Sequence, residues 1–206
     1  MLIVGHGPSL TKKGLGKEID RHTVVRLKTF KKFHNKEDYG ERTDYICSST
    51  EVMPGMLGQA NPKEYWCYPK KGEWNKDKEK KFKGLEYIIP LEETEYWNEI
   101  FRERVNYKGG SDGRNVSTGL AAVIIGAWRL KEDIILAGFD TLLDPSLDYH
   151  SVYNPSTQVS HCHKWHVENE MLFEISDHYG VNLCVLSPHS GTVDMIYTGR
   201  NSSKPS

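Results

Sequence analysis

The sequence has 206 residues but no run of eighteen apolar ones, so it offers no candidate transmembrane helix. Its first residues carry neither a basic segment nor a long apolar one, which argues against a signal peptide. The four cysteines are widely spaced and form no Cys-x-x-Cys pair, which indicates reduced thiols in a cytosolic protein. We therefore expect a cytoplasmic protein without a membrane span.

The chain also lacks an excess of charge of either sign. It has 27 basic and 28 acidic residues and a formal net charge of −1. This balance argues against a protein that binds nucleic acid over its whole surface, and it leaves a local basic face open. There is no internal repeat and no acidic pair such as Asp-x-Asp, so we expect one domain with no resident metal ion or other cofactor.

What the sequence does contain is an alternation of short apolar segments with helical ones. Because such an alternation is typical of a mostly parallel sheet covered on both faces, we expect an α/β fold, a single Rossmann-like three-layer α/β/α domain over residues 1–190. The polar residues 191–206 are expected to form a loose tail. The expected strands cover residues 1–5, 23–28, 44–48, 85–90, 134–139 and 182–187. The expected helices cover 92–104, 117–130 and 163–179, and residues 14–21 are expected to form a short helix or a turn.

Residues 62–83 differ in composition from the rest of the chain. Eight lysines and four acidic residues are interleaved with five aromatic residues, and prolines break any long helix. We interpret this segment as an insertion in the domain. One hypothesis is a solvated, lysine-rich surface. The other is a flap or docking surface for an anionic partner, because aromatic rings stack on bases and lysines pair with phosphates.

The first apolar segment ends in a glycine-rich turn, Gly5-His-Gly-Pro-Ser9. Gly5 and Gly7 allow the backbone to approach a ligand closely, and Ser9 can cap the segment that follows. A turn of this kind between a strand and a helix is typical of phosphate-binding loops in nucleotide-binding α/β folds. It also fits an ordinary tight turn, since no third glycine completes the dinucleotide-binding fingerprint.

Two further segments stand where α/β folds bind ligands. Ser117-Thr-Gly119 opens an apolar helix, where free amides can bind an anion, although these residues taken alone better fit a simple helix cap followed by tight packing. His150 follows the expected strand that ends near Gly138-Phe-Asp140, at the edge where open α/β sheets place their ligands. His150 is therefore either a ligand contact or an ordinary surface histidine.

The stretch His161-Cys-His163-Lys-Trp-His166 concentrates histidines next to Glu168. A zinc site is one interpretation, but adjacent ligands are crowded and no partner pair lies elsewhere in the chain. The other interpretation is that one of these histidines is a general base, because an imidazole has a pKa near neutrality.

Taken in order, these segments resemble the four motifs of the eukaryotic-type sialyltransferase family of glycosyltransferases. The resemblance covers about residues 1–185. The large motif resembles Val4–Leu10, Gly16–Asp20, Val25–Leu27 and Tyr39–Thr43; the small motif resembles Ser117–Gly119 with the helix and strand that follow; the third is similar to Tyr149-His150 and the last to His163 with Glu168.

The resemblance implies a fold and a set of roles. The fold is the GT-A-like variant of the Rossmann-like domain. The reaction is transfer of a sugar from a nucleotide-sugar donor, implied to be a CMP-sugar, to an acceptor hydroxyl, with inversion and without a metal ion. The resemblance implies His163 as the catalytic base and His150 as the contact to the departing phosphate. The implied donor-binding residues are Gly5, His6, Gly7, Pro8, Ser9, Lys28, Ser117, Thr118, Gly119, Tyr149 and Glu168.

The sequence departs from the family at several positions. His6 and Lys28 stand where the family has donor-contacting asparagines, and the family's cysteine pair and membrane anchor are absent. These departures fit a short bacterial or viral relative in the cytoplasm of a bacterial or host cell, and they leave the donor sugar open. The acceptor is then a glycan or, in a virus, modified DNA. The alternative is a non-catalytic module that binds a nucleotide or nucleic acid through segment 62–83.

Overall fold

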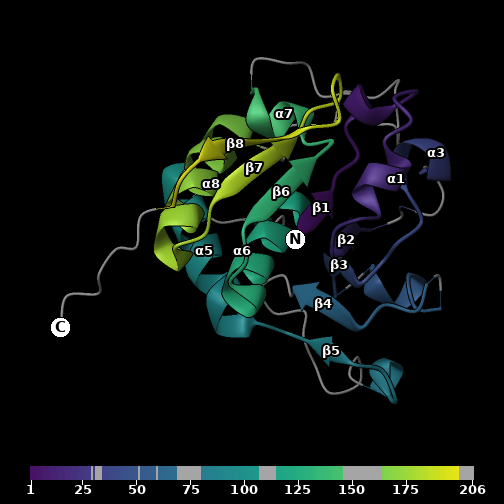
Figure 1. Cartoon of the computed structure of the whole chain (residues 1–206). Coiled ribbons are helices and arrows are strands. Elements are labelled where there is room, and N and C mark those ends of the chain that lie inside the picture. The colour runs from purple at the N-terminus through teal and green to yellow at the C-terminus, as the bar shows by residue number, and fades with distance from the viewer. Residues whose placement is uncertain are drawn as a thin grey trace.

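The computed structural model describes residues 1–28, 30, 34–50, 52–58, 60–68, 80–106, 115–145 and 164–199. These residues form an eight-stranded sheet in the order β5-β4-β3-β2-β1-β6-β7-β8, parallel throughout except for the pair β7 and β8 (Figure 1). The strands are β1 (Leu2–Val4), β2 (Val24–Leu27), β3 (Tyr45–Ser49), β4 (Glu64–Tyr68), β5 (Tyr87–Ile88), β6 (Ile134–Ala137), β7 (Leu183–Leu186) and β8 (Val193–Tyr197). The α-helices are α1 (Gly16–Ile19), α3 (Lys36–Tyr39), α5 (Leu91–Arg104), α6 (Thr118–Leu130), α7 (Asp140–Leu143) and α8 (Trp165–Tyr179), and the 3-10 helices are η1 (Pro8–Leu10), η2 (Met53–Gly55) and η3 (Lys80–Phe82).

Alternation along the strands gives the sheet two apolar faces. At β1, Met1 and Ile3 join the core on one face, whereas Leu2 and Val4 join the core on the other, because successive side chains of a strand point to opposite sides. All four side chains are buried. A parallel sheet has this burial on both faces because helices cover both. The predicted α/β fold with a mostly parallel sheet is confirmed.

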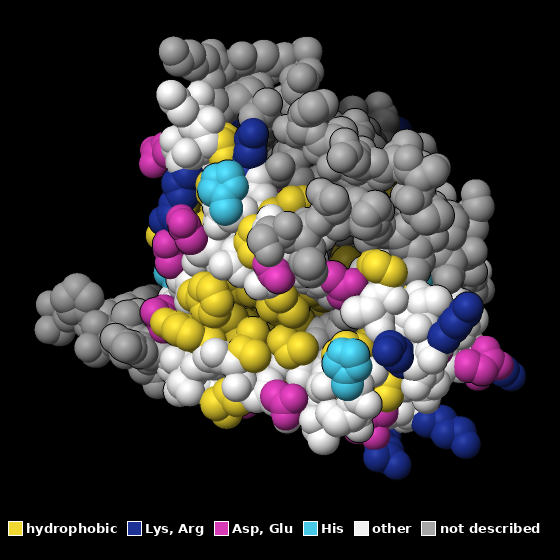
Figure 2. Space-filling view, turned by 90° about the horizontal axis from the view of Figure 1, so that it is seen from above, with side chains coloured by type: hydrophobic (Ala, Val, Ile, Leu, Met, Phe, Trp, Pro, Cys, Tyr) yellow, Lys and Arg dark blue, Asp and Glu magenta, His cyan; other side chains and the backbone are white. Residues whose placement is uncertain are grey.

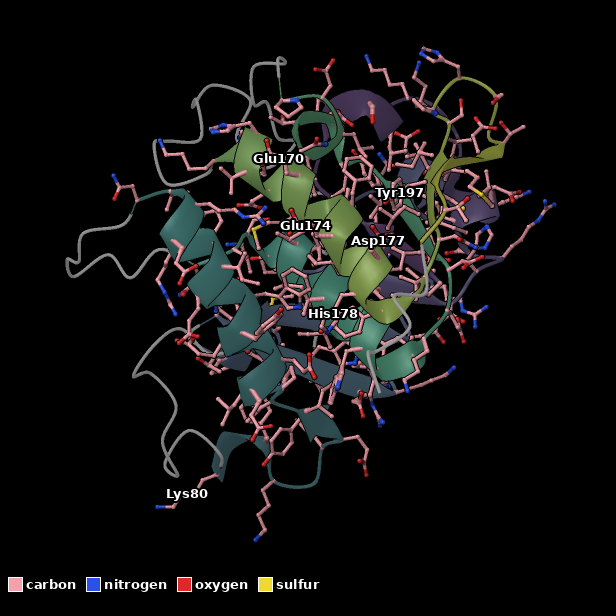
Figure 3. All side chains as sticks on the ribbon, turned by 90° about the vertical axis from the view of Figure 1, so that its left-hand side faces the viewer. Lys80, Glu170, Glu174, Asp177, His178 and Tyr197 are labelled. Carbon is pink, nitrogen blue, oxygen red and sulfur yellow. The ribbon has the colours of Figure 1, made fainter. Side chains whose placement is uncertain are left out.

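The long helices α5, α6 and α8 cover one face of the sheet (Figures 1 and 3). Residues 120–127 of α6 are all buried, because α6 contacts the strands as well as both other helices. Arg104 of α5 pairs with Glu174 of α8 at 2.7 Å, and the Tyr197 hydroxyl of β8 donates to Asp177 of α8 at 2.8 Å (Figure 3). None of the helices in the described residues is long and apolar enough to cross a membrane.

Shorter elements cover the opposite face. η1, α1 and α3 pack over β1, β2, β6 and β7 through Leu10, Ile19 and Tyr39. η2 and η3 pack over β3 and β4 through Met53 and Phe82. η1 and α1 lie in the connection from β1 to β2, and α3 lies in the connection from β2 to β3. The chain that leaves the carboxyl ends of β1 and β2 therefore passes over this face.

The order of the strands reverses at β1. Strands β2 to β5 extend the sheet on one side of β1, and β6 to β8 extend it on the other. The loops that follow β1 and β6 therefore diverge, and open α/β sheets bind their ligands in the crevice at such a switch point. Figure 2 looks onto the end of the molecule toward which β6 and β7 run, where hydrophobic side chains are grouped among acidic, basic and histidine side chains.

Segment 62–83, predicted to be a surface insertion, instead contributes the buried strand β4. Trp66 and Tyr68 pack on the face covered by α6, while Tyr65 and Cys67 pack on the other. All four are at most 4% exposed. The lysines elsewhere in the segment make its composition polar. The aromatic and cysteine side chains of β4, however, suit a strand that is buried on both faces. The surface interpretation is therefore wrong for β4, and residues 69–79 lie outside the described part of the chain.

The predicted loose tail also contains a strand. Val193–Tyr197 forms β8, which pairs antiparallel with β7. Its ladder with β7 and the packing of Tyr197 against Phe173 of α8 hold it in place. Val193, Met195 and Ile196 are each more than a third exposed, so this segment carries no pattern of a buried strand. The prediction of a loose tail is therefore wrong for residues 193–197, and residues 200–206 lie outside the described part of the chain.

Candidate functional site

The structure brings the described candidate residues to the carboxyl end of the sheet, at the switch point between β1 and β6. Gly5–Ser9 form the turn after β1, and Lys28 directly follows β2. Ser117–Gly119 begin α6, whose start lies at the same end because α6 leads through a short connection into the first residue of β6. Glu168 lies in the first turn of α8 and contacts the start of α6.

Gly5 and Gly7 lie against the loop that follows β6. The Gly5 amide donates to the carbonyl of Ala137 at 2.7 Å, and the Gly7 amide donates to that of Gly138 at 2.8 Å. A Cβ atom on Gly5 would lie 2.3 Å from the Gly138 carbonyl oxygen, and one on Gly7 would lie 2.6 Å from the Asp140 carboxyl carbon. Contact with the Gly138 backbone is therefore sufficient to require glycine at position 5, whereas a side chain at position 7 would have to displace the Asp140 carboxylate.

Asp140, which sequence analysis did not single out, fixes the end of this turn. Its carboxylate accepts hydrogen bonds from the Ser9 amide at 2.9 Å and from the Ser9 hydroxyl at 2.5 Å. Ser9 was expected to cap the segment that follows, but it lies within η1, whose N-cap residue is Gly7, and its hydroxyl donates to Asp140 instead. Pro8 is exposed at the start of η1. An acidic residue directly after a buried strand is the signal that could have identified Asp140.

His6 joins the turn after β1 to the end of β2. Its Nε2 lies 2.9 Å from the Lys28 carbonyl oxygen, and its Nδ1 lies 3.1 Å from Nε2 of His34. Burial lowers the pKa of His6 from 6.5 to about 4, and the nearby Lys28 charge acts in the same direction. At neutral pH the ring is therefore uncharged, with both nitrogens engaged. This arrangement suits a residue that holds two loops together better than a catalytic base.

The N-terminus of α6 is capped and still presents two amides. The Ser117 hydroxyl oxygen accepts from the Leu120 amide, and the Ser117 amide donates to the buried Glu168 carboxylate, each at 3.2 Å. Among the described residues, the amides of Thr118 and Gly119 have no acceptor. Because they lie at the positive end of the helix dipole, they can bind an anion.

Tyr68, which ends β4, also reaches this site, and sequence analysis missed it. Its hydroxyl lies 2.6 Å from the Thr118 hydroxyl, and both residues are buried. On the β6 side, a Cβ atom on Gly119 would lie 2.8 Å from the Phe139 ring. The start of α6 is thus positioned by β4 and by the loop after β6. No local signal marked Tyr68, because its partner is 50 positions away.

Tyr68→Phe is expected to destabilise the fold by about 1–3 kcal/mol, because the buried Thr118 hydroxyl loses this partner while the ring remains packed. Tyr65→Phe on the same strand is the matched control. Its hydroxyl donates to the Ala60 carbonyl at a longer 3.4 Å, so we expect a loss of about 0.5 kcal/mol. Urea unfolding measures the free energy of unfolding of both variants. Equal losses would contradict the prediction that the Tyr68–Thr118 hydrogen bond stabilises the fold more than the Tyr65–Ala60 bond does.

Three predicted site residues, Tyr149, His150 and His163, lie outside the described residues, so their roles stay predictions. His166, from the same histidine-rich segment, is exposed in the first turn of α8. In the part of the chain that the structure describes, no group of three or more histidine, cysteine or acidic side chains is placed to hold a metal ion.

These features define an open, mostly parallel α/β domain with a candidate anion site at its switch point. Solved structures with this fold include sialyltransferases. CST-II, solved with a trisaccharide acceptor and CMP, matches with a TM-score of 0.60 and 13% identity, over 97% of this chain and 84% of that one. An apo α-2,3-sialyltransferase from Campylobacter jejuni matches with a TM-score of 0.58 and 17% identity, over 98% and 85% of the two chains.

A mammalian sialyltransferase in complex with Gal-β-1-3GalNAc-ortho-nitrophenol has a TM-score of 0.54 and 16% identity, over 90% of this chain and 68% of that one. At these identities the similarity is one of fold. No protein-family model matches the sequence. No curated protein matches it either.

Proposed function

We propose that the protein is a glycosyltransferase that moves a sugar from a CMP-sugar donor to a hydroxyl group of a glycan. We further propose that transfer inverts the anomeric carbon and needs no metal ion. The observation that carries the proposal is the meeting of Gly5–Ser9, Lys28 and Ser117–Gly119 at one switch point, in a fold similar to that of sialyltransferases.

The candidate site contains groups that can stabilise a departing phosphate. The amides of Thr118 and Gly119 lie at the positive end of α6, and Lys28 adds a cationic side chain at the end of β2. Preorganised amides and cations of this kind stabilise negative charge as it develops in a transition state. This is the physical support for a reaction in which CMP is the leaving group.

In the proposed reaction, His163 removes the proton from the acceptor hydroxyl as the oxygen forms a bond to the anomeric carbon. The bond between that carbon and the donor phosphate oxygen breaks on the opposite side, and CMP leaves with the electron pair. His150 and the α6 amides stabilise its charge. One C–O bond forms as another breaks, and the proton moves from the acceptor oxygen to His163.

The acceptor class is proposed from two of the similar structures, which hold a trisaccharide acceptor and a Gal-β-1-3GalNAc derivative. A nucleic-acid partner bound through segment 62–83 has weaker support. Tyr65, Trp66, Tyr68 and Phe82 are buried in the core, so these rings are not available for stacking on bases. We therefore favour a glycan over DNA as the acceptor.

A nucleotide series in the presence of EDTA tests the proposal. CMP at about a hundredfold excess over its dissociation constant should stabilise the protein by about 2.7 kcal/mol, which raises the melting temperature of a domain of this size by about 5–10 °C. Cytidine, which lacks the phosphate, and UMP, which changes the base, are the matched ligand controls and should give smaller shifts. Equal melting-temperature shifts with all nucleotides, or no shift with CMP, would contradict the proposed function. A CMP shift that appears only without EDTA would contradict its independence of a metal ion.

A further inference from the structure

The hydrogen bonds of His6 determine where the protons of two histidines lie. The Lys28 carbonyl can only accept, so His6 Nε2, 2.9 Å away, carries a hydrogen. A neutral imidazole has one N–H, so His6 Nδ1 is an acceptor, and its partner 3.1 Å away, Nε2 of His34, is the donor. The relay therefore runs in one direction, from His34 to His6 and from His6 to the Lys28 carbonyl.

The surroundings of the pair keep both rings neutral. Burial lowers the pKa of His34 from 6.5 to about 2, and His6 and the Arg26 guanidinium lower it further, whereas a hydrogen bond to the Gly5 backbone acts in the opposite direction. Arg26 is itself only 1% exposed and lies over the Phe30 ring. A proton on His34 would add a positive charge near the buried Arg26 guanidinium, and one on His6 would add a positive charge near Lys28, so the neutral relay is the stable state.

His34 also packs against α3. Its ring stacks on Tyr39, with 4.1 Å between ring centroids and an interplanar angle of 5°. The buried Tyr39 hydroxyl donates to the Gly7 carbonyl at 3.4 Å and lies 3.2 Å from the Thr11 hydroxyl. The same connection therefore contacts the turn after β1 twice, through Tyr39 at Gly7 and through His34 at His6.

We propose that His34 is a positioning residue of the nucleotide site, which holds the His6 ring in the orientation that joins the turn after β1 to Lys28 after β2. This inference rests on the proposed function for the identity of the ligand, but the relay itself does not depend on it. His34 lies in a connection of charged residues that the family motifs do not include, and it acts through His6 rather than by touching the nucleotide.

The experiment compares His34→Leu, which removes the donor, with His34→Gln, whose side-chain amide can donate to His6 Nδ1. Binding of CMP is measured by calorimetry at a temperature where circular dichroism shows each variant to be folded. We expect the dissociation constant to rise about tenfold in His34→Leu, and to return to within about threefold of wild type in His34→Gln. His22→Leu, at the opposite end of β2, is the matched control and should stay within about twofold.

A second readout needs no ligand. The His6 Nε2 proton should be visible in NMR spectra of the wild type and of His34→Gln, and should exchange with water in His34→Leu. If the wild type binds no CMP, the proposed function fails, and the NMR comparison alone then decides the role of His34. A purely structural role would lower the melting temperature of His34→Leu and leave its affinity for CMP unchanged. That result, or a His6 proton that persists in His34→Leu, overturns the proposal.

Discussion

His163→Ala is expected to lower the rate of sugar transfer about 10²–10⁴-fold while CMP affinity stays near that of the wild type. The physical reason is that a general base acts on the acceptor proton in the transition state, whereas the donor is bound by the loops at the switch point. The sequence places His163 two residues before α8, and Glu168 in the first turn of α8 is hydrogen-bonded to the start of α6. Transfer kinetics and calorimetry with CMP measure the two effects separately.

His166→Ala is the matched control for this prediction, because His166 is exposed in the first turn of the same helix. It should keep turnover close to that of the wild type. A His163→Ala variant with full turnover would exclude His163 as the base and leave His161 and His166 as the candidates. Loss of both turnover and CMP binding would instead mean that His163 supports the donor site.

The second large effect is expected in the dependence of stability on pH. The pKa of His6 is lowered to about 4 and that of His34 to about 2, chiefly by burial, from an ordinary value of 6.5. The unfolded chain therefore binds protons first as the pH falls. The stability that the neutral pair contributes is fully present above pH 6.5 and is lost as the pH falls toward 4 and below. Between pH 7 and pH 5 the loss should be about 2 kcal/mol for each histidine.

A double variant, His6→Gln with His34→Gln, removes these two titrating groups. Urea unfolding at pH 7 and pH 5 should then show a fall in stability smaller by about 3–4 kcal/mol than that of the wild type. His166→Gln is the matched control and should retain the wild-type fall. If the double variant loses as much stability as the wild type over this range, the pair is not neutral and buried as described.

The fold class could be predicted because its signals are local. β1 and β6 are short, continuous apolar runs, and they lie within the predicted ranges 1–5 and 134–139. α6 and α8 likewise lie within their predicted ranges, 117–130 and 163–179. Every residue of such a run is apolar because its strand is buried on both faces of the sheet. A continuous apolar run in the sequence therefore indicates a buried strand.

Two strands could not be predicted in the same way. β4 is flanked by lysines, so the lysine-rich composition of residues 62–83 as a whole gave no indication of the five-residue strand within it. β8 is an edge strand whose side chains are largely exposed, so pairing with β7 rather than a hydrophobic pattern stabilises it. In both cases the missing information was the position of the segment in the sheet.

The sequence by itself determined the local features of the candidate site. The residues of the glycine-rich turn at Gly5–Ser9 mark its place in the chain, and the cap at Ser117 forms with the Leu120 amide three positions further on. Only the tertiary structure decided which distant side chains hold these features in place. His34 reaches His6 across 28 positions, and Asp140 reaches Ser9 across 131. Such pairs follow from the order of strands in the sheet, which brings the carboxyl ends of β1, β2 and β6 together, and no local periodicity encodes that order.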